Sequence, residues 1–242
     1  MKYLPEPSTI VVNVSHEDLD GLRILHISDL HISKKTSRAS LEKLVDVCDG
    51  LSGDFVALTG DVIDAPVKLL KDKLEILNSM SSRVYWISGN HDIFYGLEDL
   101  KKELNNFIFM DNEREFFTFN EKKIHIVGLP DRFSKFFKIK RDVDEIVKRS
   151  KENSPTIFLS HQPKDFKIAA EANASLFLCG HTHGGQIFPF HYIVRLVQPF
   201  LKGLRYRDKM AIYVNSGLGT WGLRHRYKAP SEISLLKLSY GE

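Results

Sequence analysis

The chain has little cysteine and no long apolar run, and both absences exclude kinds of protein. Its two cysteines, Cys48 and Cys179, lie far apart inside apolar segments. A disulfide framework is therefore not expected, and a reducing compartment fits two buried thiols. No segment approaches the ~20 consecutive apolar residues of a membrane-spanning helix. The start, "MKYLPEPSTIVVNV", also has no apolar stretch of signal-peptide length. We expect a cytoplasmic protein.

A strong excess of charge of one sign is also missing. The 34 basic residues nearly balance the 31 acidic ones, and the formal net charge is +3. So slight a bias does not imply a nucleic-acid partner. Internal repeats, low-complexity tracts and Gly/Ser-rich linkers are absent, so we interpret residues 1–242 as a single domain. No segment points to an obligate protein partner.

Short apolar, β-branched runs recur along the chain, and each predicts one buried strand. They occupy residues 23–28, 54–60, 83–89, 156–161 and 175–180. Helical periodicity lies between them, over residues 40–51, 67–80 and 142–151. This alternation is typical of an α/β fold with a largely parallel sheet. A hairpin over 116–130 and strands over 210–217 and 232–238 suggest a second sheet, so we expect two sheets flanked by helices.

Polar side chains follow each of the five runs directly. Because ligands gather at the carboxyl ends of parallel strands, we expect these clusters to meet at one edge. In extended backbone, side chains two residues apart point the same way. Asp29 and His31 are therefore expected to converge on one ion, and His181 and His183 likewise. Glycines around these two histidines are expected to clear room for a ligand.

Seven potential metal donors come together in this way, and their number indicates two divalent ions. They are Asp29, His31, Asp61, Asn90, His161, His181 and His183. A structural zinc takes four ligands and has no open position, whereas seven donors suit two ions that share a carboxylate. Imidazole and carboxylate without thiolate suit manganese, iron, zinc or cobalt, and donor type does not choose among them. With two aspartates and a bridging hydroxide the site keeps a charge of about +1, which favours phosphate esters as substrates.

His91 adjoins the Asn90 donor and is free to protonate a leaving group, so we assign it a catalytic role, with Asp92 orienting it. Asp64 is either a carboxylate that orients an imidazole or the N-cap of the following helix, and both stay open. The basic residues Arg224–Arg226 either meet a phosphate or form a solvated face.

Five motifs carry a family resemblance. "DLH", "GDVID", "GNHD", "SHQP" and "GHTH", in this order from about residue 22 onward, resemble the blocks of the calcineurin-like metallophosphoesterases. The resemblance implies a four-layer αββα sandwich of two mixed β-sheets and a dinuclear metal site. It also implies that Asp61 is shared between two ligand sets. These are Asp29, His31, Asp61 and His183 for one metal, and Asp61, Asn90, His161 and His181 for the other.

The block "GHTHGGQI" resembles a bacterial phosphodiesterase subgroup, some of whose members act on lipid-linked or nucleotide-sugar-lipid pyrophosphates. The expected function is therefore metal-dependent hydrolysis of a phosphodiester or pyrophosphate bond. A nuclease, a cyclic-nucleotide phosphodiesterase and a non-catalytic scaffold of the same fold are the alternatives.

Two segments, 131–141 and 187–207, mix aromatic with basic residues. Such a mixture suits peripheral contact with an anionic membrane surface, where a lipid substrate is also found. It equally suits ordinary insertions whose apolar side packs on the sandwich. The sequence leaves both interpretations open.

Overall fold

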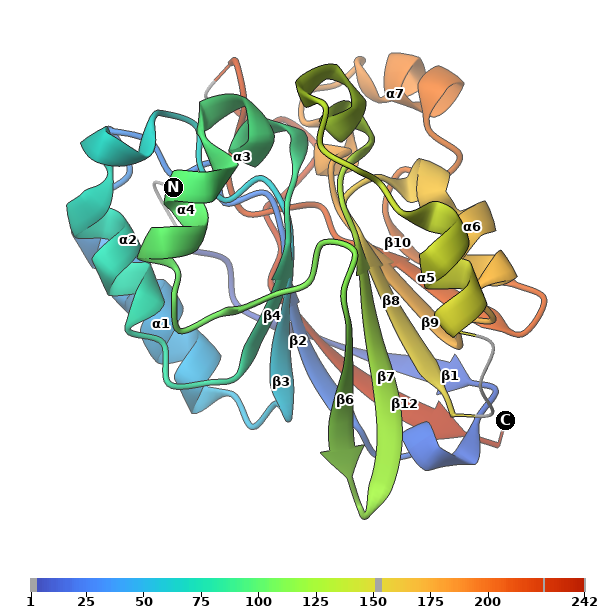
Figure 1. Ribbon diagram of the computed structural model, residues 1–242. Helices are drawn as coiled ribbons and strands as arrows, with labels where there is room; N and C mark the ends of the chain where they lie inside the picture. Colours follow the sequence, from blue (N-terminus) through green and yellow to red (C-terminus); the bar gives the residue numbers. More distant parts are fainter. Residues whose placement is uncertain (1–3, 151–153, 224, 242) are drawn as a thin grey trace.

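The computed structural model describes residues 4–150, 154–223 and 225–241, and the apolar runs of the sequence lie in two six-stranded sheets (Figure 1). The first sheet has the order β1 (Ser8–Val14), β12 (Ser234–Tyr240), β2 (Arg23–Ile27), β3 (Phe55–Thr59), β4 (Val84–Ile87), β5 (Ile108–Phe109). The second has the order β10 (Gly203–Arg207), β11 (Met210–Val214), β9 (Leu176–Cys179), β8 (Thr156–Ser160), β7 (Lys122–Leu129), β6 (Arg114–Phe119).

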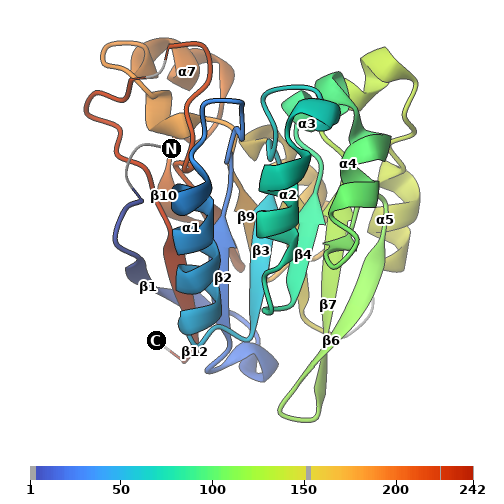
Figure 2. The ribbon, with the colours of Figure 1, turned by 90° about the vertical axis from the view of Figure 1, so that its left-hand side faces the viewer.

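Helices cover the outer face of each sheet, which gives the expected four-layer αββα sandwich (Figures 1 and 2). On the side of the first sheet lie α1 (Arg38–Gly50), α2 (Lys71–Asn78), α3 (Asn90–Tyr95) and α4 (Leu97–Glu103). On the side of the second lie α5 (Val143–Arg149) and α6 (Phe166–Glu171), and α7 (His191–Val197) stands at the upper edge in Figure 1. Among the described residues, no helix is both long and apolar enough to cross a membrane.

Helix α1 shows why these segments fold as they do. The side chain of Ser37 accepts a hydrogen bond from the Ser40 amide and caps the first turn. Leu41, Leu44 and Cys48 recur at helical spacing and are buried against the first sheet, as expected for Cys48.

The strands are apolar throughout because both of their faces are covered. In β3, Val56 and Leu58 pack toward the helices, whereas Phe55 and Ala57 pack between the two sheets. Alternate residues of one strand thus belong to two different cores, which explains the continuous apolar run.

The sheet assignment differs from the sequence-based expectation in two respects. Of the last two predicted strands, β11 lies in the second sheet, but β12 lies in the first, parallel to β1 and antiparallel to β2. The five strands that precede the polar clusters are also divided. Strands β2, β3 and β4 are in the first sheet, and β8 and β9 are in the second. The clusters therefore meet between the carboxyl edges of two sheets, because an apolar run specifies a strand but not its neighbour.

Candidate metal centre

The predicted donors leave their strands through unusual backbone turns. Asp29, His31, Asp61, His181 and His183 all have φ between 45° and 71°, the left-handed region. The extended backbone expected for these pairs is therefore wrong: Asp29 and His31 still converge in one group, whereas His181 and His183 lie in different groups. The turns are held from neighbouring loops, since the Asp29 amide donates to the Gly60 carbonyl at 2.9 Å and the His31 amide to the Asp61 carbonyl at 3.0 Å. Non-glycine residues in this conformation are costly and cluster at functional sites.

The glycines of the motifs allow the loops themselves to approach closely. A Cβ atom on Gly89 would overlap the Asp61 carboxylate, and one on Gly180 would overlap Ser28 Oγ and Asp29 Oδ2. A Cβ on Gly185 would lie 2.5 Å from His191 Cβ. The expectation that glycines clear room for a ligand is corrected accordingly, because they make room for the protein's own side chains.

Three donors form a first group at the end of β2 and after β9. Asp29 Oδ1 lies 3.3 Å from His183 Nε2, and His31 Nε2 lies 3.0 Å from the same nitrogen. All three side chains are buried. Their ligand atoms lie within 4.8 Å of one another.

A second group lies beside the first. Asp61 Oδ2 is 3.3 Å from His161 Nε2, which is 3.2 Å from His181 Nδ1. Asp61 Oδ2 is also 3.6 Å from His31 Nε2, so one carboxylate oxygen lies between the two groups. Asn90, at the start of α3, lines the same pocket as Asp61 and His181. The structure thus brings six of the seven predicted donors into two adjacent groups, and Asn90 lies in the pocket beside them.

Unpaired polar atoms show that this cluster fits a pair of cations. Asp29 Oδ1 and Asn90 Oδ1 are buried without a hydrogen-bond partner among the described residues. A buried oxygen without a partner is rare and needs an explanation. Carboxylate and amide oxygens that converge with imidazole nitrogens are the ligand types of divalent manganese, iron, zinc or cobalt.

The electrostatics keep four of the donors, Asp29, Asp61, His31 and His181, in the forms that bind cations. Burial favours a raised pKa for Asp29 and Asp61, but the neighbouring histidines hold both well below the ordinary value. Burial lowers the pKa of His31 to about 3 and that of His181 to about 4, so both imidazoles are neutral at pH 7. The pKa of His161 is raised instead, because attraction to Asp61 outweighs its burial.

A set of surrounding groups orients the donors. His161 Nδ1 lies 2.7 Å from the Thr59 carbonyl and donates to it, which directs Nε2 into the site. Asp61 Oδ1 accepts from the His91 amide at 2.8 Å, and Asp29 Oδ2 accepts from the His181 amide at 3.0 Å. Each carboxylate is thus fixed by one oxygen and offers the other to the site.

His91 is positioned by a different carboxylate from the one expected. Its Nδ1 lies 2.8 Å from Asp64 Oδ1. Asp92 instead accepts hydrogen bonds from the amides of Val62, Ile63 and Gly89 at 2.8 to 3.0 Å. The orienting role predicted for Asp92 is therefore corrected to Asp64, and the alternative of Asp64 as a helix cap is wrong because Pro66 holds that position.

Arg226 also differs from both interpretations offered for the basic residues near the end of the chain. Its guanidinium points inward and donates to the carbonyls of Ser216 at 2.9 Å and Gly217 at 3.1 Å, with His183 Nδ1 at 3.0 Å. It therefore ties the last loop to a donor histidine. His225 is exposed, and Arg224 lies outside the described residues.

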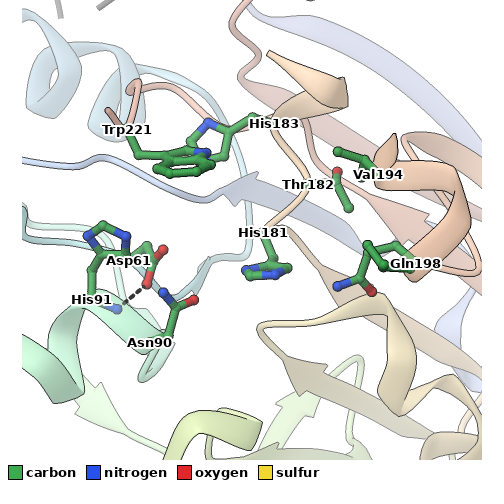
Figure 3. Close-up of a pocket in the computed structure, with 10 residues that line it drawn as sticks. Asp61, Asn90, His91, His181, Thr182, His183, Val194, Gln198 and Trp221 are labelled. Carbon is green, nitrogen blue, oxygen red and sulfur yellow. Dashed lines mark hydrogen bonds between the residues drawn. The ribbon is translucent and has the colours of Figure 1, made fainter. Parts of the chain in front are cut away.

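The donors open into a pocket of about 240 Å³, which Figure 3 shows from close by. Asp61, Asn90 and His91 lie on one side of it and face His181. Its other walls are Thr182, His183, Val194, Val197, Gln198 and Trp221. Val194, Val197, Gln198 and Trp221 were missed as site residues. Only their place in the aromatic and glycine-rich segments after the "GHTH" motif could have indicated them.

Comparisons with known proteins agree with this geometry. The family model described as calcineurin-like phosphoesterase matches residues 22–185. An uncharacterized metallophosphoesterase of Helicobacter pylori is 34% identical over 224 residues, which cover 90% of this chain and 60% of that protein. The chain therefore spans about 60% of the length of that relative. The UDP-2,3-diacylglucosamine pyrophosphatase LpxG of Chlamydia muridarum is 27% identical over 284 residues. The match covers 92% of this chain and 85% of that protein.

A solved structure of a dimetal phosphatase from Danio rerio superimposes with a TM-score of 0.55 at 11% identity, over 82% of this chain and 88% of that one. This likeness shows a common fold. The match of the family model and the ordered motifs go further than the fold. They show that the chain belongs to the calcineurin-like phosphoesterase family.

Proposed function

We propose that this protein is a hydrolase that cleaves a phosphodiester or pyrophosphate bond with two divalent cations. The observation that carries the proposal is the Asp61 carboxylate, which lies between two groups of buried imidazole and carboxylate donors. Two cations in such groups supply a water molecule of lowered pKa and stabilise the charge that develops on phosphoryl oxygens. The donor types suit manganese, iron, zinc or cobalt equally.

The chain's own residues have separate roles in this proposal. Asp29, His31 and His183 hold one cation, and Asn90, His161 and His181 hold the other, with Asp61 shared. The Asn90 amide adds a ligand oxygen without adding negative charge, so the site keeps its attraction for an anion.

His91 is the proposed proton donor to the leaving group. It lines the same pocket, and the hydrogen bond to Asp64 fixes its ring. Because the pocket is shared with Asp61 and Asn90, a phosphate held by the cations lies within reach of His91.

The pocket walls support an apolar group on the substrate. Val194, Val197 and Trp221 line the pocket that also contains the donors. A phosphate ester that carries an apolar group fits a pocket with both metal donors and apolar walls better than a small hydrophilic ester does. We therefore propose a lipid-linked or nucleotide-sugar-lipid pyrophosphate as the substrate class. The name of the Chlamydia relative, a pyrophosphatase of UDP-2,3-diacylglucosamine, is consistent with it.

The proposed location is a reducing compartment such as the cytoplasm, at the inner membrane surface. Cys48 and Cys179 are buried free thiols, and burial raises the pKa of Cys48 to about 12. Neither thiol needs an oxidising environment for the fold to form.

Turnover and metal content test the function together. Protein loaded with manganese is assayed on bis-p-nitrophenyl phosphate and then on lipid pyrophosphates, cyclic nucleotides and single-stranded DNA. Asp61→Asn should lose at least about 100-fold in turnover and most of the bound metal, because it removes the shared ligand. Asp72→Asn, which changes an exposed carboxylate paired with Arg38, should keep both. Full turnover after metal removal verified by elemental analysis contradicts the proposal.

A further inference from the structure

Exposed apolar side chains gather around the opening of the pocket. We call them the mouth surface, and its members are Phe188, Phe190, Tyr192, Ile193, Leu196, Trp221 and Leu223. Leu196 is 86% exposed and Ile193 is 57% exposed. Single exposed apolar residues are ordinary, but a set this dense marks an interaction site.

Helix α7 is the most prominent part of the mouth surface. None of its residues from His191 to Val197 is buried. It stands at the end of the molecule where the site lies, away from the packed helices α1 and α2 (Figures 1 and 2). Val194 and Val197 line the pocket, whereas Ile193 and Leu196 are among its most exposed apolar residues. The helix therefore joins the pocket wall to the outer surface.

The two segments that form the mouth surface carry charge of one sign. Residues 187–202 and 221–230 contain five lysines and arginines and no aspartate or glutamate. Of the 34 basic residues, 29 remain for the rest of the chain, against all 31 acidic ones. Arg226 points inward, so it is not free for a partner. Exposed basic side chains remain at Arg195, Lys202 and Lys228.

Basic and aromatic side chains are interleaved on this surface. Lys228 Nζ lies 4.7 Å from the ring centre of Phe188 and 5.6 Å from that of Tyr227. Aromatic rings beside lysines suit the headgroup region of a bilayer, where rings enter the apolar boundary and ammonium groups meet lipid phosphates.

We propose that the mouth surface docks on an anionic lipid bilayer, with α7 lying in the headgroup region. The absence of acidic residues from both segments favours an anionic partner, and the exposed Leu196 and Ile193 favour one with an apolar interior. Docking in this way turns the pocket opening toward the membrane, where a lipid-linked phosphate is found. The inference goes beyond the proposed function, since docking needs no hydrolysis.

Vesicle sedimentation tests the docking. Wild-type protein is mixed with vesicles of phosphatidylcholine alone, or with about 30% phosphatidylglycerol, at low and at physiological salt. We expect binding to the anionic vesicles that is at least tenfold tighter than to neutral ones and that weakens with salt. The double variant Ile193→Asp/Leu196→Asp should lose at least tenfold of that binding. The matched control Val11→Asp/Tyr240→Asp changes residues that are 59% and 51% exposed on β1 and β12, and it should bind as the wild type does.

Each other outcome overturns the docking. It is wrong if wild-type protein stays in solution with anionic vesicles, or if Ile193→Asp/Leu196→Asp binds them as tightly as the wild type. Self-association that this variant abolishes, without vesicle binding, assigns the surface to a second copy instead. Turnover on bis-p-nitrophenyl phosphate separates the two proposals, since the variant should keep it. Vesicle binding without any such turnover in the wild type counts against the proposed function alone.

Discussion

At the scale of single residues, the site depends on a left-handed backbone conformation that residues other than glycine rarely adopt. Five of the seven donors have positive φ, and each costs on the order of 1–3 kcal/mol. Hydrogen bonds between the loops, such as that from the Asp29 amide to the Gly60 carbonyl, offset part of this cost. The donors are thereby fixed before any cation binds, which favours binding over a flexible arrangement.

Substitutions at His91 and its neighbours test how the proposed proton donor is held. His91→Ala should lower turnover by about 100- to 10,000-fold while the metal content stays unchanged, because this side chain acts on the leaving group. Asp64→Asn should cause a smaller loss, also without loss of metal. Asp92→Asn should instead destabilise the fold by about 1–3 kcal/mol, because one oxygen that accepts a backbone amide is replaced by a donor.

Turnover, elemental analysis and thermal unfolding distinguish these three variants. If Asp64→Asn behaves as the wild type while Asp92→Asn loses turnover without loss of stability, the reassignment from Asp92 to Asp64 is wrong.

The chemistry of these residues was predictable from the sequence, but their arrangement was not. The residue types and their order were sufficient to name seven residues whose side chains meet at this edge. The role of Asp92 was misassigned because residues 90–92 form the first turn of α3, where consecutive side chains point about 100° apart. The side chains of His91 and Asp92 therefore point in different directions although the two residues are adjacent in sequence. Asp64 reaches His91 from another loop.

At the scale of the elements, the loops after the strands approach one another so closely that only glycine fits at two of the contact points. Gly180, directly after β9, contacts Ser28 and Asp29 at the end of β2, and Gly89 contacts the Asp61 loop. The closeness of the two sheets at this edge is what brings donors from both into one site. The sequence shows the glycines but not what they touch.

Alanine at these glycines should separate the loops. Gly180→Ala and Gly89→Ala should each lower the free energy of unfolding by about 1–3 kcal/mol and weaken manganese binding, because the new methyl group displaces a ligand loop. Gly50→Ala, at the end of α1, has open space around its Cβ and should be neutral or stabilising by about 0.5–1 kcal/mol. Chemical denaturation and manganese titration measure both effects. Unchanged manganese affinity in Gly180→Ala argues against this role of the close contact.

Asp111 links two elements and predicts a pH dependence of stability. Its Oδ1 accepts a hydrogen bond from the Ser88 amide at 3.0 Å, which joins the end of β4 to the segment after β5. Burial raises the pKa of Asp111 to about 6, above its ordinary 3.8. The folded state therefore binds more protons than the unfolded state between these values, and stability should fall as pH rises through this window.

Asp111→Asn keeps the oxygen that accepts from Ser88 and removes the titration. Between pH 4 and pH 7 the unfolding free energy of the wild type should fall by about 1–3 kcal/mol relative to that of the variant. Above about pH 7 the difference should stay constant. Denaturation curves at several pH values give this difference. A difference that does not change with pH contradicts a raised pKa at Asp111.

At the scale of the whole molecule, the site exists only because two sheets converge. Apolar periodicity predicted nine of the twelve strands in the described residues and two sheets flanked by helices, since these depend on local pattern, but it missed β1, β5 and β10. It did not predict that β12 joins the first sheet, because pairing between β1 and β2 depends on contacts distant in sequence. It left the aromatic segments undecided for the same reason. Whether an aromatic segment packs against the rest of the protein depends on the folded structure. In α7 no residue is buried.

The presence of two cations is tested most directly by anomalous scattering from a crystal of the manganese-loaded protein. We predict two peaks, one beside Asp29, His31 and His183 and one beside Asn90, His161 and His181, with the Asp61 carboxylate between them. A single peak, or none, with Asp61 turned away from His31 and His161, would contradict a shared two-cation site.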